Sequence, residues 1–379
     1  MVSTDRSGSA NNHDWQDSPS AFGRYQGREG ALTVRIEFTH DDCVQAEIVH
    51  HYSDELLVAS SHRKVFIHGS SCGTSVITLP RTPVDLLGWS RLLRRALRLD
   101  KCNVFPLDEQ GKSMLIIRQG VVFKYHRDKG FRQTLLLRQC RNLLHTDFCK
   151  MKSGRLIFGE YGANSQLHPV PIYASDDDGE TWEIIHEIDA GKARHIHGVY
   201  ADKFHNKVWI FTGDANGECW VIEASEDFSD VRYLGDGGQH YRACTVFFTP
   251  DKVIWVMDSP LQPSQTVHLD RYTREIELHA FFPGPVWYGL EIAGFGYLVA
   301  STVEPGDAVV SHEAAIFSST DLISWSRLAS FAKDRWPMGL FKFGVIGFSR
   351  GARSDGAFFV FGEALKKLDG RSLRCEIKL

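Results

Sequence analysis

Two histidines in the pattern His195-Ile-His197 are the residues of this sequence best suited to metal or proton chemistry. Residues two apart in a strand point to the same face, so both imidazoles can flank one substrate or share one divalent metal ion. The motif contains no third ligand of its own, and Asp214 or His145 could supply one. We therefore identify His195 and His197 as candidate metal ligands, while no other motif requires a cofactor.

A wider set of polar side chains recurs at corresponding points of successive segments, where an apolar run begins or ends. Carboxyl groups and imidazoles in such a set can act as general acids and bases. Guanidinium groups match a sugar carboxylate with two parallel hydrogen bonds, and an aromatic pair can form a platform for a sugar ring. The catalytic candidates are His145, His197, Glu160, Asp214, Asp258 and Tyr288. The substrate-binding candidates are Arg118, Arg242, Arg194, His195, Tyr241, Asn164 and Trp287.

Each of these residues also has a simpler interpretation as a solvated strand end, because polar residues are common where strands meet loops. For Trp287 the competing interpretation is packing inside the fold. The set as a whole mixes acids, imidazoles and guanidiniums, which are costly to gather at one place unless they are solvated or used. The combination therefore favours a functional site more than any single member does.

An internal repeat indicates which elements position these residues. The segment Ser175-Asp-Asp177-Asp-Gly179-Glu-Thr181-Trp182 reads as a tight turn between two short strands. Asp177 can bind the amides of the turn, and Gly179 can supply a positive φ. Weaker copies occur at 318–325 and 225–229, and similar turns lie near 70, 126, 270 and 367, which are 45 to 56 residues apart. Seven units of this length account for almost all of the chain after residue 30.

The repeat predicts an all-β fold, a seven-bladed β-propeller with four-stranded blades, with six blades as the alternative. A helical repeat would show a 3.6-residue apolar period, whereas 33 Gly, 24 Phe, 11 Tyr and 9 Trp suit short strands and tight turns. We expect one domain over 31–379 behind a flexible polar tail at 1–30. The longest step of the repeat contains a basic amphipathic stretch, so we also expect a short helical insertion near 85–99.

Composition excludes several classes of protein. The net charge of −4 disfavours a nucleic-acid binder, and no apolar run reaches the roughly 20 residues that span a bilayer. The first residues do not resemble a secretion signal, and the eight cysteines form no CxxC pair, so we expect a cytoplasmic protein with reduced thiols. The basic stretch at 91–99 is expected to pack on the propeller, with an anionic membrane surface or partner as the alternative.

The turn formed by Ser175, Asp177, Gly179, Thr181 and Trp182 resembles the Asp-box (BNR) turn of the sialidase-like propeller superfamily. The resemblance implies the propeller fold from about residue 37 to the end, with the boxes as structural turns remote from the active site. A sialidase would also be expected to carry an arginine triad, a Tyr–Glu nucleophile pair and a Phe/Tyr-Arg-Ile-Pro motif. Only two arginines align here and that motif is absent, so the resemblance extends to the architecture and not to sialidase activity.

Fold and candidate residues together predict a carbohydrate-active propeller that binds an acidic, uronate-type glycan at the rim of the central channel. Two reactions fit the residue types: glycoside hydrolysis by a carboxyl pair, and β-elimination, in which a His or Tyr removes a proton and Arg or a metal stabilises the enolate. The alternative is a non-catalytic propeller that binds glycan or protein partners.

Overall fold

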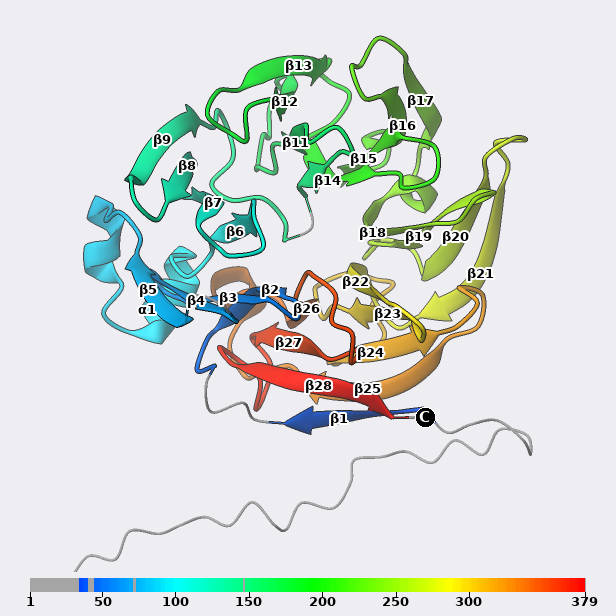
Figure 1. Ribbon diagram of the computed structural model, residues 1–379. Coiled ribbons are helices and arrows are strands. Elements are labelled where there is room, and N and C mark those ends of the chain that lie inside the picture. Colours follow the sequence, from blue (N-terminus) through cyan, green and yellow to red (C-terminus); the bar gives the residue numbers. More distant parts are fainter. Residues whose placement is uncertain (1–33, 40–43, 71–72, 146, 379) are drawn as a thin grey trace, which may run out of the picture. The chain divides into compact units, whose positions relative to one another are not determined.

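The described part of the chain forms seven antiparallel sheets arranged in a ring, with the innermost strands around a central channel (Figure 1). The computed structural model describes residues 34–39, 44–70, 73–145 and 147–378, which belong to a unit spanning Val34–Leu379. Each sheet has four strands. The predicted seven-bladed β-propeller is therefore confirmed over the six-bladed alternative, whereas the predicted tail at 1–30 lies outside the described residues.

The first six blades follow the chain, with the innermost strand first. Blade one consists of β2 (Ile48–Tyr52), β3 (Leu56–Ser61), β4 (Lys64–Gly69) and β5 (Gly73–Thr78). Blade two consists of β6 (Asn103–Pro106), β7 (Ser113–Arg118), β8 (Val121–His126) and β9 (Gly130–Leu136). Blade three consists of β10 (Cys149–Lys150), β11 (Leu156–Gly159), β12 (Val170–Ser175) and β13 (Glu183–Ile188). Blade four consists of β14 (His195–Ala201), β15 (Lys207–Gly213), β16 (Cys219–Ser225) and β17 (Val231–Gly237). Blade five consists of β18 (Ala243–Phe248), β19 (Lys252–Met257), β20 (Ser264–Asp270) and β21 (Ile276–Phe282). Blade six consists of β22 (Val286–Ile292), β23 (Gly296–Ser301), β24 (Glu313–Ser319) and β25 (Ser326–Ala332).

The seventh blade is built from both ends of the described chain. Strands β26 (Val345–Phe348), β27 (Phe358–Glu363) and β28 (Ser372–Lys378) are completed on the outside by β1 (Arg35–Thr39), which pairs antiparallel with β28. The turn near 367 therefore joins the second and third strands of its blade, unlike the other six turns of the repeat. The sequence spacing did not reveal this shift, because the fourth strand comes from the other end of the chain.

Blades are buried on both faces because each packs between two neighbours. Strand β15 is buried along almost its whole length, and Trp209 of that strand packs with Trp255 of β19 in one apolar cluster between blades four and five. Strands covered on both sides carry continuous apolar runs instead of alternating ones. The continuous runs seen in the sequence at 156–158, 208–211 and 253–257 are explained by this packing.

The turn after β12 is held by its own side chains. Asp177 Oδ1 accepts a hydrogen bond from the Thr181 amide at 2.9 Å, and Ser175 Oγ accepts one from the Gly179 amide at 2.8 Å. The Trp182 indole donates to Thr134 Oγ1 of blade two at 3.2 Å. Because this turn joins a third strand to a fourth, it lies on the face opposite to the one where innermost strands begin. We call that second face, where innermost strands begin and second strands end, the rim face.

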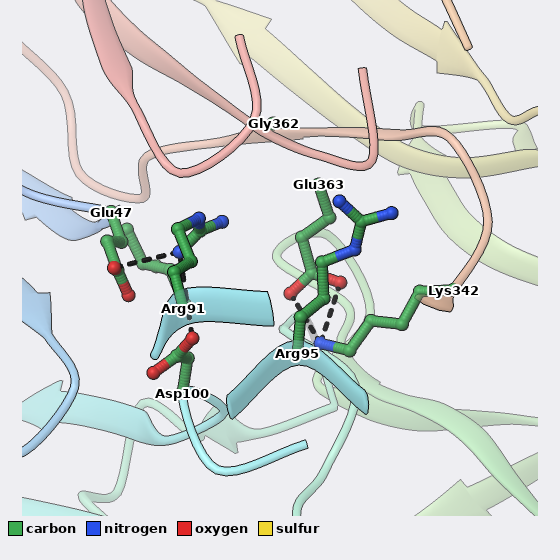
Figure 2. Close-up of a pocket in the computed structure, with 8 residues that line it drawn as sticks. Glu47, Arg91, Arg95, Asp100, Lys342, Gly362 and Glu363 are labelled. Carbon is green, nitrogen blue, oxygen red and sulfur yellow. Dashed lines mark hydrogen bonds and ion pairs between the residues drawn. The ribbon is translucent and has the colours of Figure 1, made fainter. Parts of the chain in front are cut away.

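A helical insertion packs on the rim face between β5 and β6. It consists of a 3-10 turn, η1 (Pro83–Leu87), and α1 (Arg91–Leu97), whose N-cap is Ser90. Figure 2 shows Arg91 against Glu47, with Nη1 2.8 Å from Glu47 Oε1 and 3.6 Å from Asp100 Oδ2. The remaining short helices are α2 (Met338–Phe341) and η2 (Gln239–Tyr241). Within the described ranges, no helix has the length and apolar character needed to cross a membrane.

Candidate functional site

Five of the sequence-predicted residues come together on the rim face of blades four and five. His195 and His197 lie in β14, Asp214 directly follows β15, Arg242 directly precedes β18 and Asp258 directly follows β19. We call these five residues the blade-four cluster. Four of them are buried, whereas 36% of the Asp214 side chain is exposed, so the cluster opens to solvent at Asp214.

Short contacts connect every member of the cluster. His197 Nε2 lies 3.0 Å from both His195 Nε2 and Asp214 Oδ1. Arg242 lies between the two aspartates, with Nη2 3.1 Å from Asp214 Oδ1 and Nε 3.4 Å from Asp258 Oδ2. The Arg242 Nη1 group also donates to the Asp214 main-chain oxygen at 3.0 Å. The guanidinium is thus fully engaged inside the protein, and it does not present a free face to a substrate.

A β-bulge places His197 in the cluster. The register between β14 and β15 shifts between Ile196 and Gly198, so His197 has no partner across the ladder. A bulge redirects the side chain of the extra residue. The imidazole then lies over Gly213, where a Cβ atom would come within 2.5 Å of His197 Cε1. Gly213 is therefore required by the close approach of the histidine ring.

Equivalent bulges occur in β2, β18 and β22, at His50, Cys244 and Trp287. The residues that correspond to His197 by register are therefore these three. The repeat in the sequence instead aligned His197 with Arg242 and Tyr288. Because all of these strands carry the bulge, the misalignment reflects connecting segments of different length, 202–206 after β14 and 249–251 after β18.

Two further groups belong to the surroundings of the cluster. Cys244 Sγ donates to Asp258 Oδ2 at 3.1 Å. Glu304, in the loop after β23, is buried, and burial together with the neighbouring Asp258 raises its pKa to about 8. Glu304 therefore carries a proton at neutral pH. Burial alone would raise the pKa of Asp214, but its contacts with His195 and His197 outweigh burial and keep this carboxyl ionised.

Several buried polar atoms of the site lack a hydrogen-bond partner within the described part of the chain. They are His197 Nδ1, Asp258 Oδ1 and Glu304 Oε1. Buried polar groups are nearly always hydrogen-bonded, and exceptions gather where a ligand, ion or water completes the set. Ordered water or a ligand would complete the hydrogen bonds of these three atoms.

Two other predicted residues at the ends of second strands have internal partners. Arg118 is buried and forms two hydrogen bonds with Asp85 of η1, one of them Nη1 to Oδ2 at 3.1 Å. Glu160 accepts hydrogen bonds from the amides of Arg138 and Gln139, both at 2.7 Å. Both charged groups are thus occupied by internal partners, away from the blade-four cluster.

Three other substrate-binding candidates lie beside the cluster in loops. Asn164 donates to the main-chain oxygens of His168 and Arg194 and so shapes the loop before β12. The Arg194 guanidinium is 35% exposed and lies 3.4 Å from Glu218. Tyr241 of η2 packs against Trp255, with ring centroids 6.2 Å apart. All three residues are partly exposed.

A small cavity of about 50 Å³ gathers the other candidates on the rim face. The His145 and Tyr288 rings lie 6.0 Å apart edge to face, and burial holds the pKa of His145 well below its ordinary value. Asn103 Oδ1, His145 Nε2 and Trp287 Nε1 are buried without hydrogen-bond partners in the described chain. The cavity lining comprises Ile48, Lys101, Cys102, Asn103, Leu143, His145, Trp287, Tyr288, Val345, Gly347, Phe361 and Glu363.

Sequence reasoning missed three residues of this region. Tyr161 packs on His195 with ring centroids 4.3 Å apart, and burial followed by the nearby Asp214 raises its pKa well above the ordinary value. Glu304 and Cys244 complete the surroundings of Asp258. Tyr161 directly follows an aligned strand end, which was the available signal, whereas Glu304 lies in a loop that carries no pattern.

Comparisons with known proteins identify the fold and nothing finer. No protein-family model matches the chain, and no curated protein matches it in sequence. Among solved structures, a streptogramin B lyase structure aligns with a TM-score of 0.52 and 10% identity, over 91% of this chain and 98% of that one. The WD40 repeats of RRP9 align with a TM-score of 0.53 and 7% identity, over 91% and 98% of the two chains. The structure of U3-55K gives 0.52 and 7%, over 90% and 98%. Identities this low support the propeller fold, which several functions share.

Proposed function

We propose that the protein is a carbohydrate-active enzyme that cleaves an acidic, uronate-type glycan on its rim face, by β-elimination. The observation that carries this proposal is the contact of Tyr161 with His195, within a buried charged cluster that opens to solvent at Asp214. Buried titratable groups with strongly shifted pKa values gather at catalytic sites more often than elsewhere. The adjoining cavity offers polar groups for the hydroxyls of a neighbouring sugar.

In the elimination, a base removes the proton from the carbon next to the sugar carboxylate. The electron pair left on that carbon forms the new double bond as the glycosidic C–O bond on the adjacent carbon breaks. The leaving oxygen then takes a proton. The Tyr161 hydroxyl carries a proton at neutral pH, as tyrosines ordinarily do, so it can protonate that oxygen. His145 lines the adjoining cavity and burial keeps its imidazole neutral, so it is the candidate base.

The alternative reaction, hydrolysis, needs one protonated and one free carboxyl group on either side of the glycosidic bond. Asp214 and Asp258 are both held by Arg242, and Asp258 also accepts a hydrogen bond from Cys244. Glu160 is tied to main-chain amides. These three carboxylates are therefore better suited to supporting contacts than to a hydrolytic pair, and the protonated Glu304 is buried beside Asp258.

The test is an incubation of the purified chain with uronate-containing polysaccharides, followed by ultraviolet absorbance and by a reducing-end assay. We expect an unsaturated, ultraviolet-absorbing product, and a Tyr161→Phe variant that turns over about 10²- to 10⁴-fold more slowly with unchanged thermal unfolding. The matched control is Tyr272→Phe, a 75% exposed tyrosine in the turn between β20 and β21, which should behave like the wild type.

Two results would contradict the proposal. Reducing ends without an absorbing product would replace elimination by hydrolysis. Glycan binding without any cleavage would make the protein a non-catalytic binding propeller.

A further inference from the structure

Three ligand atoms converge at the open edge of the blade-four cluster. They are His195 Nε2, His197 Nε2 and Asp214 Oδ1. The separations are 3.0 Å between the two nitrogens, 3.0 Å from His197 Nε2 to Asp214 Oδ1, and 3.4 Å from His195 Nε2 to the same oxygen. Three such atoms lie this close only when a proton or a cation stands between them, because their lone pairs repel one another.

The surroundings of the imidazoles show which nitrogens carry protons. His195 Nδ1 lies 2.6 Å from the main-chain oxygen of Gly162, which can only accept, so this nitrogen donates. The Nε2 atom of neutral His195 is therefore an acceptor. His197 Nδ1 faces Asp258 Oδ2 at 3.6 Å, another acceptor. With a proton on that nitrogen, His197 also presents a bare Nε2 to the convergence point.

The net charge of the cluster also favours a bound cation. Arg242 is the one Lys or Arg side chain that pairs with Asp214 or Asp258 among the residues the structure describes. Two carboxylates therefore face a single guanidinium, and one negative charge remains in a largely buried site. Burying an uncompensated charge is strongly unfavourable, so the site favours uptake of a cation.

We propose that His195, His197 and Asp214 bind a divalent first-row transition-metal ion. Ligand atoms at about 2.0–2.2 Å from one ion stand roughly 2.8–3.6 Å apart at angles near 90–110°, and the observed separations fall within this range. Two imidazoles and one carboxylate suit zinc, iron or manganese, and three protein ligands leave positions open for a substrate.

The role of the ion rests on the proposed function, whereas the site itself does not. An enolate forming next to the sugar carboxylate needs a positive partner. Arg242 cannot serve, since Asp214 and Asp258 occupy it. An ion at the exposed edge of Asp214 could bind the sugar carboxylate directly, and this would select acidic glycans over neutral ones.

Outer contacts would orient the ligands as they do in metalloproteins. A ligating histidine nearly always donates its other N–H to a main-chain oxygen or a carboxylate. Here the Gly162 oxygen faces His195 and Asp258 faces His197, while Cys244 Sγ donates to Asp258 at 3.1 Å. The alternative is a single proton on His197 Nε2 shared with Asp214 and His195. That arrangement would leave the lone pair of His197 Nδ1 facing the Asp258 carboxylate.

The experiment uses the full chain, stripped with a chelator and titrated with Co²⁺ and with Zn²⁺ by calorimetry and visible absorption. We expect one tight site per chain and Co²⁺ ligand-field bands in the wild type. Affinity should fall by more than about 100-fold in His195→Ala and in the near-isosteric Asp214→Asn, and by about 10- to 100-fold in Asp258→Asn. Asp214 is partly exposed, so its variant keeps the test valid if His195→Ala does not fold.

The matched control is His279→Ala, in a second group of potential ligands formed with His268 and Glu277 in blade five. It should bind Co²⁺ with wild-type affinity and spectrum. Absence of saturable binding, or binding that survives in Asp214→Asn and is lost in His279→Ala, would overturn the proposal. Eliminative cleavage that persists after chelation would reject the role of the ion in catalysis, whereas the titration decides the site itself. A tight metal site in a chain that cleaves no acidic glycan would reject the proposed function alone.

Discussion

Replacing Arg118 by Met tests whether this arginine supports the fold or binds substrate. The sequence placed it among the substrate-binding candidates, whereas its side chain is 2% exposed and forms two hydrogen bonds with Asp85, which is 1% exposed. Removing one partner of a buried pair costs about 3–5 kcal/mol, because the other charge stays buried. Asp85 keeps the Thr82 amide at 2.8 Å, so we expect the lower end, about 3 kcal/mol.

Urea unfolding followed by circular dichroism measures this loss. A change of about 3 kcal/mol is on the order of 100-fold in the folding equilibrium constant, and it lowers the midpoint without a change of slope. The double variant Asp85→Asn/Arg118→Met should recover part of the loss, since it leaves no buried charge. The control Arg232→Met removes a pair with Asp230 that is 60% and 46% exposed, and should cost about 0–1 kcal/mol.

The pH dependence follows from the carboxyl group. Burial alone would raise the pKa of Asp85, but hydrogen bonds from Arg118 and Thr82 lower it to about 2. The pKa of an unfolded Asp is about 4, so the pair contributes its full stability above that pH and loses it as the pH falls towards 2. The difference between wild type and double variant should shrink over the same range.

One outcome would refute this reasoning. If Arg118→Met unfolds at the midpoint of Arg232→Met, and its KM for an acidic glycan rises instead, Arg118 binds substrate as the sequence suggested.

Three further variants have definite expected outcomes. Glu304→Gln should become more stable than the wild type to heat as the pH rises from about 4.5 to 8, and the difference should stay constant above that pH. The reason is that a carboxyl with its pKa raised to about 8 destabilises the folded wild type increasingly across that range. A stability difference that does not depend on pH would contradict this prediction. Asp177→Ala removes the hydrogen bonds to Thr181 and should lower the free energy of unfolding in urea by about 1–2 kcal/mol, with no change in turnover. A loss of activity would instead place this turn in the active site. Gly213→Ala puts a Cβ within 2.5 Å of His197 and should slow cleavage about 100-fold by displacing the His197 ring. Wild-type turnover of this variant would show that the position of the His197 ring does not matter.

The seven-fold repeat was predictable because several blades carry, between their third and fourth strands, a turn with its own side-chain hydrogen bonds. Ser175 and Asp177 bind the turn amides, and Asp227 and Asp321 do the same in weaker copies. Such local chemistry is visible in sequence. The closure of the ring by β1 was not predictable in this way, because pairing of β1 with β28 depends on residues more than 330 positions apart.

The candidate site was predictable only in part. The strand-end rule found His197, Asp214, Arg242 and Asp258, because the ends of adjacent innermost strands meet around the channel, and the His-Ile-His pattern added His195. The same rule also selected strand ends whose side chains turn to internal partners. Which way a side chain turns depends on neighbours distant in sequence and on single-residue bulges, and neither leaves a periodic signal.

The most direct test of the site is a structure of the protein with a saturated uronate oligosaccharide and the divalent ion that binds most tightly. The account predicts a sugar carboxylate at the exposed edge of Asp214, with the ring reaching Tyr161 and the adjoining sugar extending towards Trp287. An oligosaccharide bound on the opposite face or on the outer strands would contradict it, as would one bound on the rim face away from His195 and His197.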